Sequence, residues 1–139
     1  MSTEVNLTAA REVAETWLKA CQHFEVFADA ADYLAWTYVR DARHAGTLEL
    51  IDDPEITQGR QRFALSVALE LPPVQSVEDA LALFNLADWL DNITVICKEF
   101  GVEGGLMLQI KGPLDTFSEA TLIEASRKLS EAKAFFEEV

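Results

Sequence analysis

The sequence is short of basic residues. Its 139 residues include 11 Lys and Arg against 24 Asp and Glu, which gives a formal net charge of −13. A charge of this sign keeps a protein soluble and repels polyanions, so it argues against direct binding to nucleic acid or to an anionic membrane. No apolar run is long enough to cross a bilayer, and residues 1–17 lack the basic and then apolar pattern of a secretory signal. We therefore expect a cytoplasmic protein that does not bind membranes.

Metal-binding and redox residues are also scarce. The chain has two cysteines, Cys21 and Cys97, and two histidines, His23 and His44. None of the four lies at the spacing of a zinc or redox motif, and residues two apart on a helix, such as Cys21 and His23, point to different sides. We expect no metal site and no cofactor, with both thiols reduced and buried.

Catalytic motifs are absent as well. Neither a G-x-S-x-G motif nor a papain-type cysteine motif occurs. Gly101, Gly104 and Gly105 lie between two predicted strands, whereas phosphate-binding loops need a strand-to-helix junction. The acidic residues at 52–55 lack the spacing of a calcium loop and fit a solvated loop. No residue is therefore nominated as catalytic, cofactor-binding or metal-binding, and we expect a protein that is not an enzyme.

Helical periodicity is the first signal that the chain does carry. Apolar residues three and four apart predict an amphipathic helix that Thr8 caps and that ends near Gln22. Residues 24–32 (FEVFADAAD) leave two alternatives open, an extension of this helix or a loop onto the first strand. The apolar stripe of the helix consists of Val13, Trp17, Cys21 and Phe24.

Strand signals follow. Aromatic and β-branched residues predict a strand over Tyr33–Arg40, and a second short strand follows at residues 46–53. Strict alternation of apolar residues predicts a third strand over residues 62–71. Pro72 and Pro73 end it, because proline cannot donate to a strand ladder.

The second half of the chain predicts a helix, a hairpin and a helix. Ser76 opens a capping-box-like S-V-E-D, and the helix that it begins ends near residues 91–92. Residues 93–111 alternate around a glycine-rich turn and predict a β-hairpin. Ser118 caps the last helix, whose narrow stripe suits packing on a sheet or on a partner helix. The stripe consists of Leu122, Ala125, Leu129, Ala132, Phe136 and Val139.

The order of elements is therefore helix, three strands, helix, two strands, helix. Strands joined by short turns favour antiparallel pairing, so we expect an α+β fold with one five-stranded antiparallel sheet, in the order α-β-β-β-α-β-β-α. No repeat or long linker divides the chain, so residues 1–139 are expected to form a single domain.

The three tryptophans raise the question of a binding surface. Core packing is the default for Trp17, Trp36 and Trp89, since tryptophan is usually mostly buried. Trp89 points somewhat away from the main apolar face of its predicted helix and is flanked by Asp88 and Asp91. An exposed tryptophan is typical of a protein-contact hot spot. We therefore take Trp89, Asp88 and Asp91, together with Trp36, as candidate partner-binding residues.

Residues 62–136 resemble the YbjN-like family, whose members share the fold of the type III secretion chaperones. Three segments carry the resemblance: ALALFNLADWLDN, then TVICKEFGVEGGLMLQIKGPLDTFSEATL, then AKAFF. Asn85 stands where members have a helical Asn, and Asp88 stands where many have a second one. The resemblance implies a frequent homodimer and a role in binding other proteins without chemistry. It does not imply a secretion client.

Three functions remain open. The leading hypothesis is a dimeric chaperone-like or adaptor protein that takes up a segment of a specific client protein on apolar patches and free strand edges. The alternative is an acidic inhibitor or DNA mimic that occupies the basic site of a nucleic-acid-binding protein. The third is an enzyme with an unrecognised carboxylate site, which would need a deep pocket and perturbed pKa values.

Overall fold

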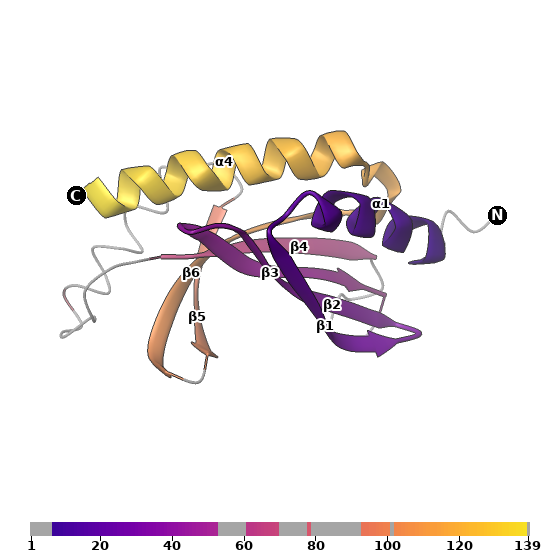
Figure 1. Cartoon of the computed structure of the whole chain (residues 1–139), viewed down its shortest axis with the longest axis horizontal. Coiled ribbons are helices and arrows are strands. Elements are labelled where there is room, and N and C mark those ends of the chain that lie inside the picture. Colours follow the sequence, from indigo (N-terminus) through magenta and orange to yellow (C-terminus); the bar gives the residue numbers. More distant parts are fainter. Residues whose placement is uncertain (1–6, 53–60, 70–77, 79–92, 101, 139) are drawn as a thin grey trace.

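The computed structural model describes residues 7–52, 61–69, 78, 93–100 and 102–138. In this part of the chain, two helices cover one face of a six-stranded antiparallel sheet (Figure 1). The class and the order of elements agree with the prediction, although the helix predicted from Ser76 lies outside the described residues apart from the helical Glu78. The elements are α1 Leu7–Lys19, β1 His23–Ala30, β2 Tyr33–Asp41, β3 His44–Ile51, β4 Arg62–Ala68, β5 Ile93–Phe100, β6 Val102–Pro113, the 3-10 turn η1 Leu114–Thr116, and α4 Glu119–Glu138.

The sheet has one strand more than the five predicted. The additional strand is β1, which takes up most of the segment left open between a helical extension and a loop. Helix α1 ends at Lys19, before the predicted Gln22, and it begins at Leu7, so Thr8 lies inside its first turn. β1 forms because a two-residue turn at residues 31–32 places Ala30 opposite Tyr33 and pairs the strand with β2.

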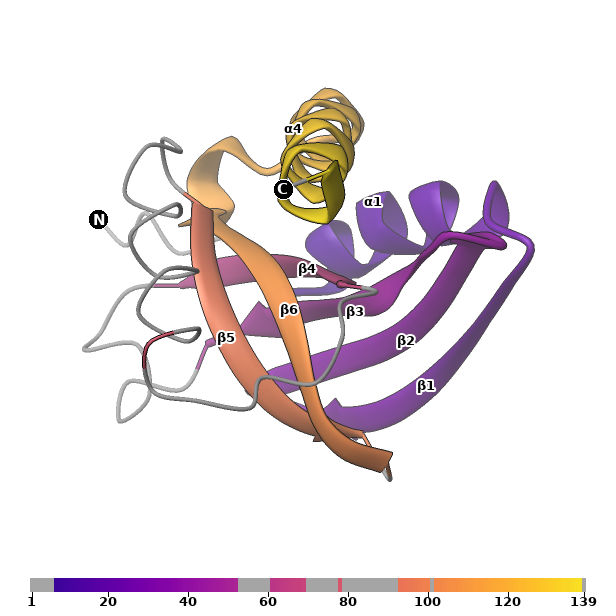
Figure 2. The ribbon, with the colours of Figure 1, turned by 90° about the vertical axis from the view of Figure 1, so that its left-hand side faces the viewer.

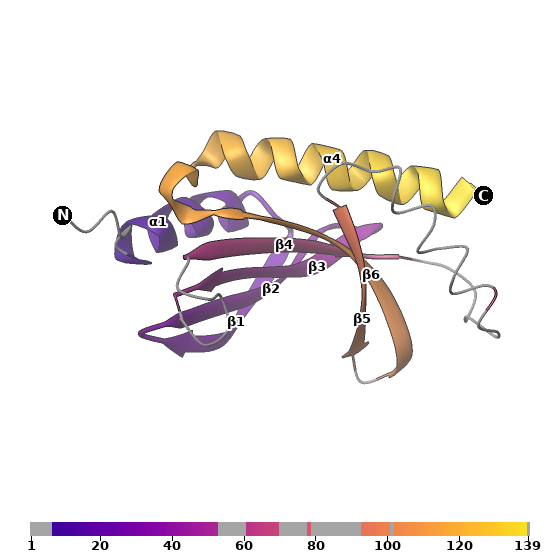
Figure 3. The same cartoon turned by 180° about the vertical axis from the view of Figure 1, so that it is seen from behind.

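Four strands align their apolar residues on the face of the sheet that the helices cover. Trp36 lies opposite Leu48, Leu48 opposite Leu65, and Leu65 opposite Ile110. All four are buried in the core. The sheet curves beneath α1 and α4 (Figure 2), and these two helices lie side by side above it (Figure 3). Strand order across the sheet is β1-β2-β3-β4-β6-β5.

The C-terminal helix follows its prediction closely. The hydroxyl of Ser118 accepts a hydrogen bond from the backbone N–H of Thr121 at 3.2 Å, which confirms the cap. Burying a large apolar side chain stabilises a fold by about 1.5–3 kcal/mol, so this stripe holds α4 firmly on the sheet. Its buried members are Leu122, Ala125, Leu129, Ala132 and Phe136.

The opposite face of the sheet carries a buried polar row. Thr47 lies opposite Ser66, and Ser66 lies opposite Gln109. The hydroxyl of Ser66 accepts from the Thr47 N–H at 3.1 Å and is 2.7 Å from the Thr47 hydroxyl. These bonds satisfy polar groups that would otherwise destabilise the middle of the sheet.

Candidate functional site

Of the residues predicted to contact a partner, only Trp36 lies in the described part of the chain. Its side chain is 1% exposed and packs in the core, on the face of the sheet that the helices cover. A partner could reach this ring only if the core opened, so Trp36 is a core residue in this fold. Trp89, Asp88 and Asp91 lie outside the described residues, and their placement stays a prediction.

The outer edge of β1 is the candidate binding surface that the structure indicates. We define the β1 edge as strand β1 with its turn residues 31–32. β1 stands first in the strand order, and none of the strands described here pairs with its outer side (Figure 2). An edge strand presents unpaired N–H and C=O groups, which are a template for another strand.

Two large apolar side chains are exposed on the β1 edge. Val26 is 50% exposed and Phe27 is 55% exposed. The register between β1 and β2 shifts between Val26 and Ala28, so Phe27 is the extra residue of a β-bulge. Bulges re-aim side chains and are frequent beside functional sites. The bulge here leaves a phenylalanine in solvent, which favours a contact surface over a core role.

The β1 edge is also acidic. Glu25 and Asp29 are exposed on the strand, and Asp32 is exposed in the turn that follows. No Lys or Arg lies between His23 and Asp32. Natural edge strands are often protected from pairing by lysine side chains, and this edge carries carboxylates in their place.

One basic residue from α1 reaches this edge. The two terminal nitrogens of Arg11 donate to the two carboxylate oxygens of Asp29 at 3.2 and 3.1 Å. Its Nε donates to Glu15 at 3.0 Å. These bonds raise the pKa of Arg11, with the hydrogen bond to Asp29 as the largest cause. Arg11 thus fixes α1 to β1 and offsets one of the edge carboxylates, whereas the ion pair of Glu25 among the described residues is with His23, at 3.2 Å.

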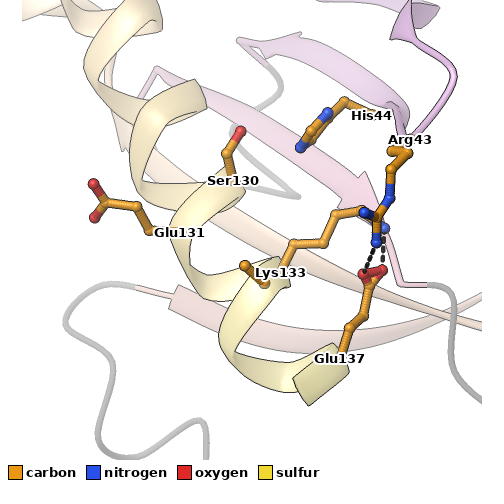
Figure 4. Close-up of a pocket in the computed structure, with 7 residues that line it drawn as sticks. Arg43, His44, Ser130, Glu131, Lys133 and Glu137 are labelled. Atoms are coloured by element: carbon orange, nitrogen blue, oxygen red, sulfur yellow. Dashed lines mark hydrogen bonds and ion pairs between the residues drawn. The ribbon is translucent and has the colours of Figure 1, made fainter.

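A pocket of about 360 Å³ lies on another side of the molecule, between the β2–β3 turn and α4 (Figure 4). Lys133 donates from its wall to the carbonyl oxygen of Ala68 at 3.0 Å and to Glu137 at 2.5 Å. Arg43 faces the other oxygen of Glu137 at 3.7 Å. Because Lys133 and Arg43 share the carboxylate of Glu137, this arrangement ties the end of α4 to the sheet and to the β2–β3 turn.

The described residues offer little for catalysis. No group of three or more His, Cys, Asp or Glu that could hold a metal occurs among them. Burial raises the pKa of the Cys21 thiol, which keeps it protonated and weakly nucleophilic. Burial also raises the pKa of Tyr38, whose hydroxyl donates to the Ser66 carbonyl at 2.7 Å. No helix in the described part of the chain is long and apolar enough to cross a membrane.

Sequence reasoning missed the β1 edge. The available signal was the segment FEVF, in which three apolar residues surround a glutamate just after the helix ends. Phe24 continues the helical stripe and packs against the core, so the same letters fit a helix as well as a strand. Which of these side chains stay exposed depends on the bulge and on the position of β1 in the sheet. Local periodicity predicts neither of the two.

Comparison with known proteins supports the fold. No protein-family model matches the chain, and neither does any curated protein. A chain from the HopA1–SchA chaperone–effector complex is similar in structure, with a TM-score of 0.58, 17% sequence identity, and coverage of 98% of this chain and 100% of that chain. At this identity the likeness shows the fold alone.

Proposed function

We propose that this protein is a non-catalytic, chaperone-like or adaptor protein of the cytoplasm that binds an extended segment of a client protein along the β1 edge. The observation that carries the proposal is an edge strand whose outer side pairs with none of the described strands and which bears two half-exposed apolar side chains, Val26 and Phe27. A client segment would add as a strand to β1, with backbone hydrogen bonds giving affinity and side-chain contacts giving specificity.

The structural neighbour supports this proposal at the level of the fold, because it belongs to a chaperone–effector complex. Membership of the YbjN-like family, which the segments quoted above suggest, remains part of the proposal. So does the homodimer, an oligomeric state that static light scattering tests.

The test compares two phenylalanines of one chain. Phe27→Ser removes an apolar side chain that is 55% exposed on the β1 edge, and Phe135→Ser removes one that is 44% exposed on α4. We expect the first to weaken client binding by on the order of tenfold, the cost of removing an interface aromatic, and the second to leave it unchanged. The client is captured from the protein's own cell lysate, identified by mass spectrometry, purified and titrated against both variants.

Amide hydrogen exchange locates the contact directly. Strand addition should slow exchange at residues 23–30 in the complex, because the outer N–H groups of β1 would gain partners. Equal losses of affinity in Phe27→Ser and Phe135→Ser, with no change in exchange along β1, would contradict the proposal.

An acidic inhibitor or DNA mimic is the second candidate, and the net charge of −13 is the observation that favours it. It differs from the first because its binding would depend on charge over a wide surface rather than on Phe27. The Phe27→Ser variant would then retain its partner.

A further inference from the structure

The side chains on the two faces of β1 indicate which residues a client segment needs in order to pair with this strand. This inference rests on the proposed function and specifies the partner of the same edge. We propose that the client segment alternates basic and apolar residues, so that lysine or arginine side chains meet Glu25 on one face of the strand while apolar side chains pack beside Val26 on the other.

The register of β1 on β2 assigns each side chain to a face. Val26 lies opposite Trp36 and Asp29 lies opposite Leu34, so both belong to the face that the helices cover. Side chains of adjacent strands interact on one face, so a matching segment places its apolar residues on this face, beside Val26. Asp29 stands on the same face and is held by Arg11.

The other face favours a cation. Glu25 lies opposite Thr37, on the face away from the helices. Its side chain is 70% exposed, and its described partner is the imidazole of His23 at 3.2 Å. A segment that placed Lys or Arg beside Glu25 would gain an opposite-charge pair across the strands, whereas a glutamate there would be repelled.

The charge of the edge also selects against the wrong partner. A second copy of this chain would bring its own Glu25 and Asp29 to the same strand in an edge-to-edge pairing, and like charges across strands destabilise such a pair. The acidic edge therefore stays open for strands of opposite charge while it disfavours self-association through β1.

Arg11 modulates the affinity of the site for cations. Its guanidinium holds both oxygens of Asp29, so an incoming cation must share that carboxylate or displace Arg11. Glu25 has no such competitor among the Arg and Lys side chains described here. We therefore expect Glu25 to contribute more than Asp29 to the preference for a basic segment.

The experiment uses three synthetic ten-residue peptides that share alternating valines and carry Lys, Ser or Glu at the intervening positions. Each is titrated into the protein at low ionic strength, with backbone amide shifts of residues 23–30 as the readout. We expect the Lys peptide to bind at β1 on the order of tenfold more tightly than the Ser peptide, and the Glu peptide to bind more weakly still.

Matched variants separate the charge effect from general electrostatics. Glu25→Gln should remove most of the preference for Lys over Ser, whereas Glu131→Gln, a 67% exposed glutamate on α4, should leave it intact.

If all three peptides perturb β1 equally, the edge accepts strands without regard to charge, and this inference is overturned while the proposed function stands. If none of them perturbs β1, strand addition at this edge is overturned as well. If the Lys peptide binds away from β1, or binds Glu25→Gln as tightly as the unchanged protein, the inference is also wrong.

Discussion

Gly46 lies on β3 where the backbone of β4 passes very close. A Cβ atom added there would lie 1.9 Å from the carbonyl oxygen of Ser66 and 2.6 Å from its carbonyl carbon. The same oxygen accepts the hydroxyl of Tyr38 at 2.7 Å, so its position matters to the buried core. A backbone group in the middle of a sheet cannot swing aside as a flexible side chain can.

We therefore expect Gly46→Ala to destabilise the protein by about 1–3 kcal/mol, the usual effect of overpacking. Urea denaturation followed by tryptophan fluorescence measures the change. Gly112→Ala serves as the comparison, because a Cβ there would meet the ring of Phe63, a side chain, at 2.5 Å. A loss at Gly112 larger than the loss at Gly46 would show that the close backbone approach does not set the cost.

Asp41 gives the β2–β3 turn a dependence on pH. Its carboxylate accepts the N–H of Arg43 at 2.9 Å and the N–H of His44 at 3.1 Å, and it lies 2.8 Å from Nδ1 of the His44 ring. These contacts lower the pKa of Asp41, with the Arg43 N–H as the largest cause and the His44 side chain next. The charged form is therefore stabilised in the folded state.

The sign of the effect follows from linkage. A carboxyl whose pKa is lower in the folded state contributes stability above its ordinary pKa and loses that contribution as the pH falls through the lowered value. We expect Asp41→Asn to remove this contribution, so that its stability deficit relative to the unchanged protein shrinks as the pH drops below the ordinary range of aspartate. Urea midpoints measured across acidic pH for both proteins check this. A deficit that stays constant down to the lowest pH would contradict the role of the carboxylate.

Among the elements, α4 depends on an ion pair that is nearly removed from water. The side chains of Lys133 and Glu137 are 3% and 10% exposed and lie one helical turn apart. Lys133 also donates to the carbonyl oxygen of Ala68 at the end of β4, which fastens the helix to the sheet. Removing one partner of a buried pair leaves the other charge without compensation.

We expect Lys133→Met to destabilise the protein by on the order of 3 kcal/mol, and Glu137→Gln to do so to a similar extent. The double variant should recover part of the loss, since no buried charge is then left alone and Arg43, which loses Glu137, is 70% exposed. Thermal or urea denaturation of the four proteins of this double-mutant cycle measures the coupling. Additive losses in the double variant would mean that the two side chains act independently.

The same helix shows what the sequence could reveal about the elements. The stripe of α4 and the alternation of β4 are long and regular, so their periods identified them, and the cap at Ser118 followed from residue type. β1 was not identified, because its eight residues carry Phe24 in phase with the preceding helix and become a strand only by pairing with β2. Tertiary pairing decided that segment, and local propensity could not.

The candidate site was harder to predict for the same reason. Trp36 is of a residue type that is common in interfaces, yet the register of β2 places it on the helix-covered face. Phe27 looks like core material in the sequence, yet a bulge on an edge strand leaves it in solvent. Exposure depends on which strand is outermost and where the ladder slips, and both are properties of the assembled sheet.

At the scale of the whole molecule, charge and apolar contacts are both present at the β1 edge and have to be separated. The net charge of −13 attracts basic partners from a distance and speeds their encounter. Salt shortens the range of that attraction, from about 10 Å at 0.1 M to about 3 Å at 1 M. The contact of an apolar side chain with Phe27 is not screened in this way. The salt dependence of the affinity therefore separates the electrostatic contribution from the apolar one.

We expect the client complex to lose about tenfold in affinity or less on going from 50 to 200 mM salt, because Glu25 is the main carboxylate of the β1 edge that pairs with the segment. A partner that recognised the whole acidic surface as it would recognise DNA would lose on the order of a thousandfold or more over the same range. Affinity capture from the cell lysate, washed at both salt concentrations and read by mass spectrometry, distinguishes the two. One stoichiometric partner that survives the wash is the result that client binding requires. A set of nucleic-acid-binding proteins that is lost at high salt would favour the acidic-mimic alternative. Binding through Phe27 would persist in salt, so its complete loss would mean that Phe27 does not contribute.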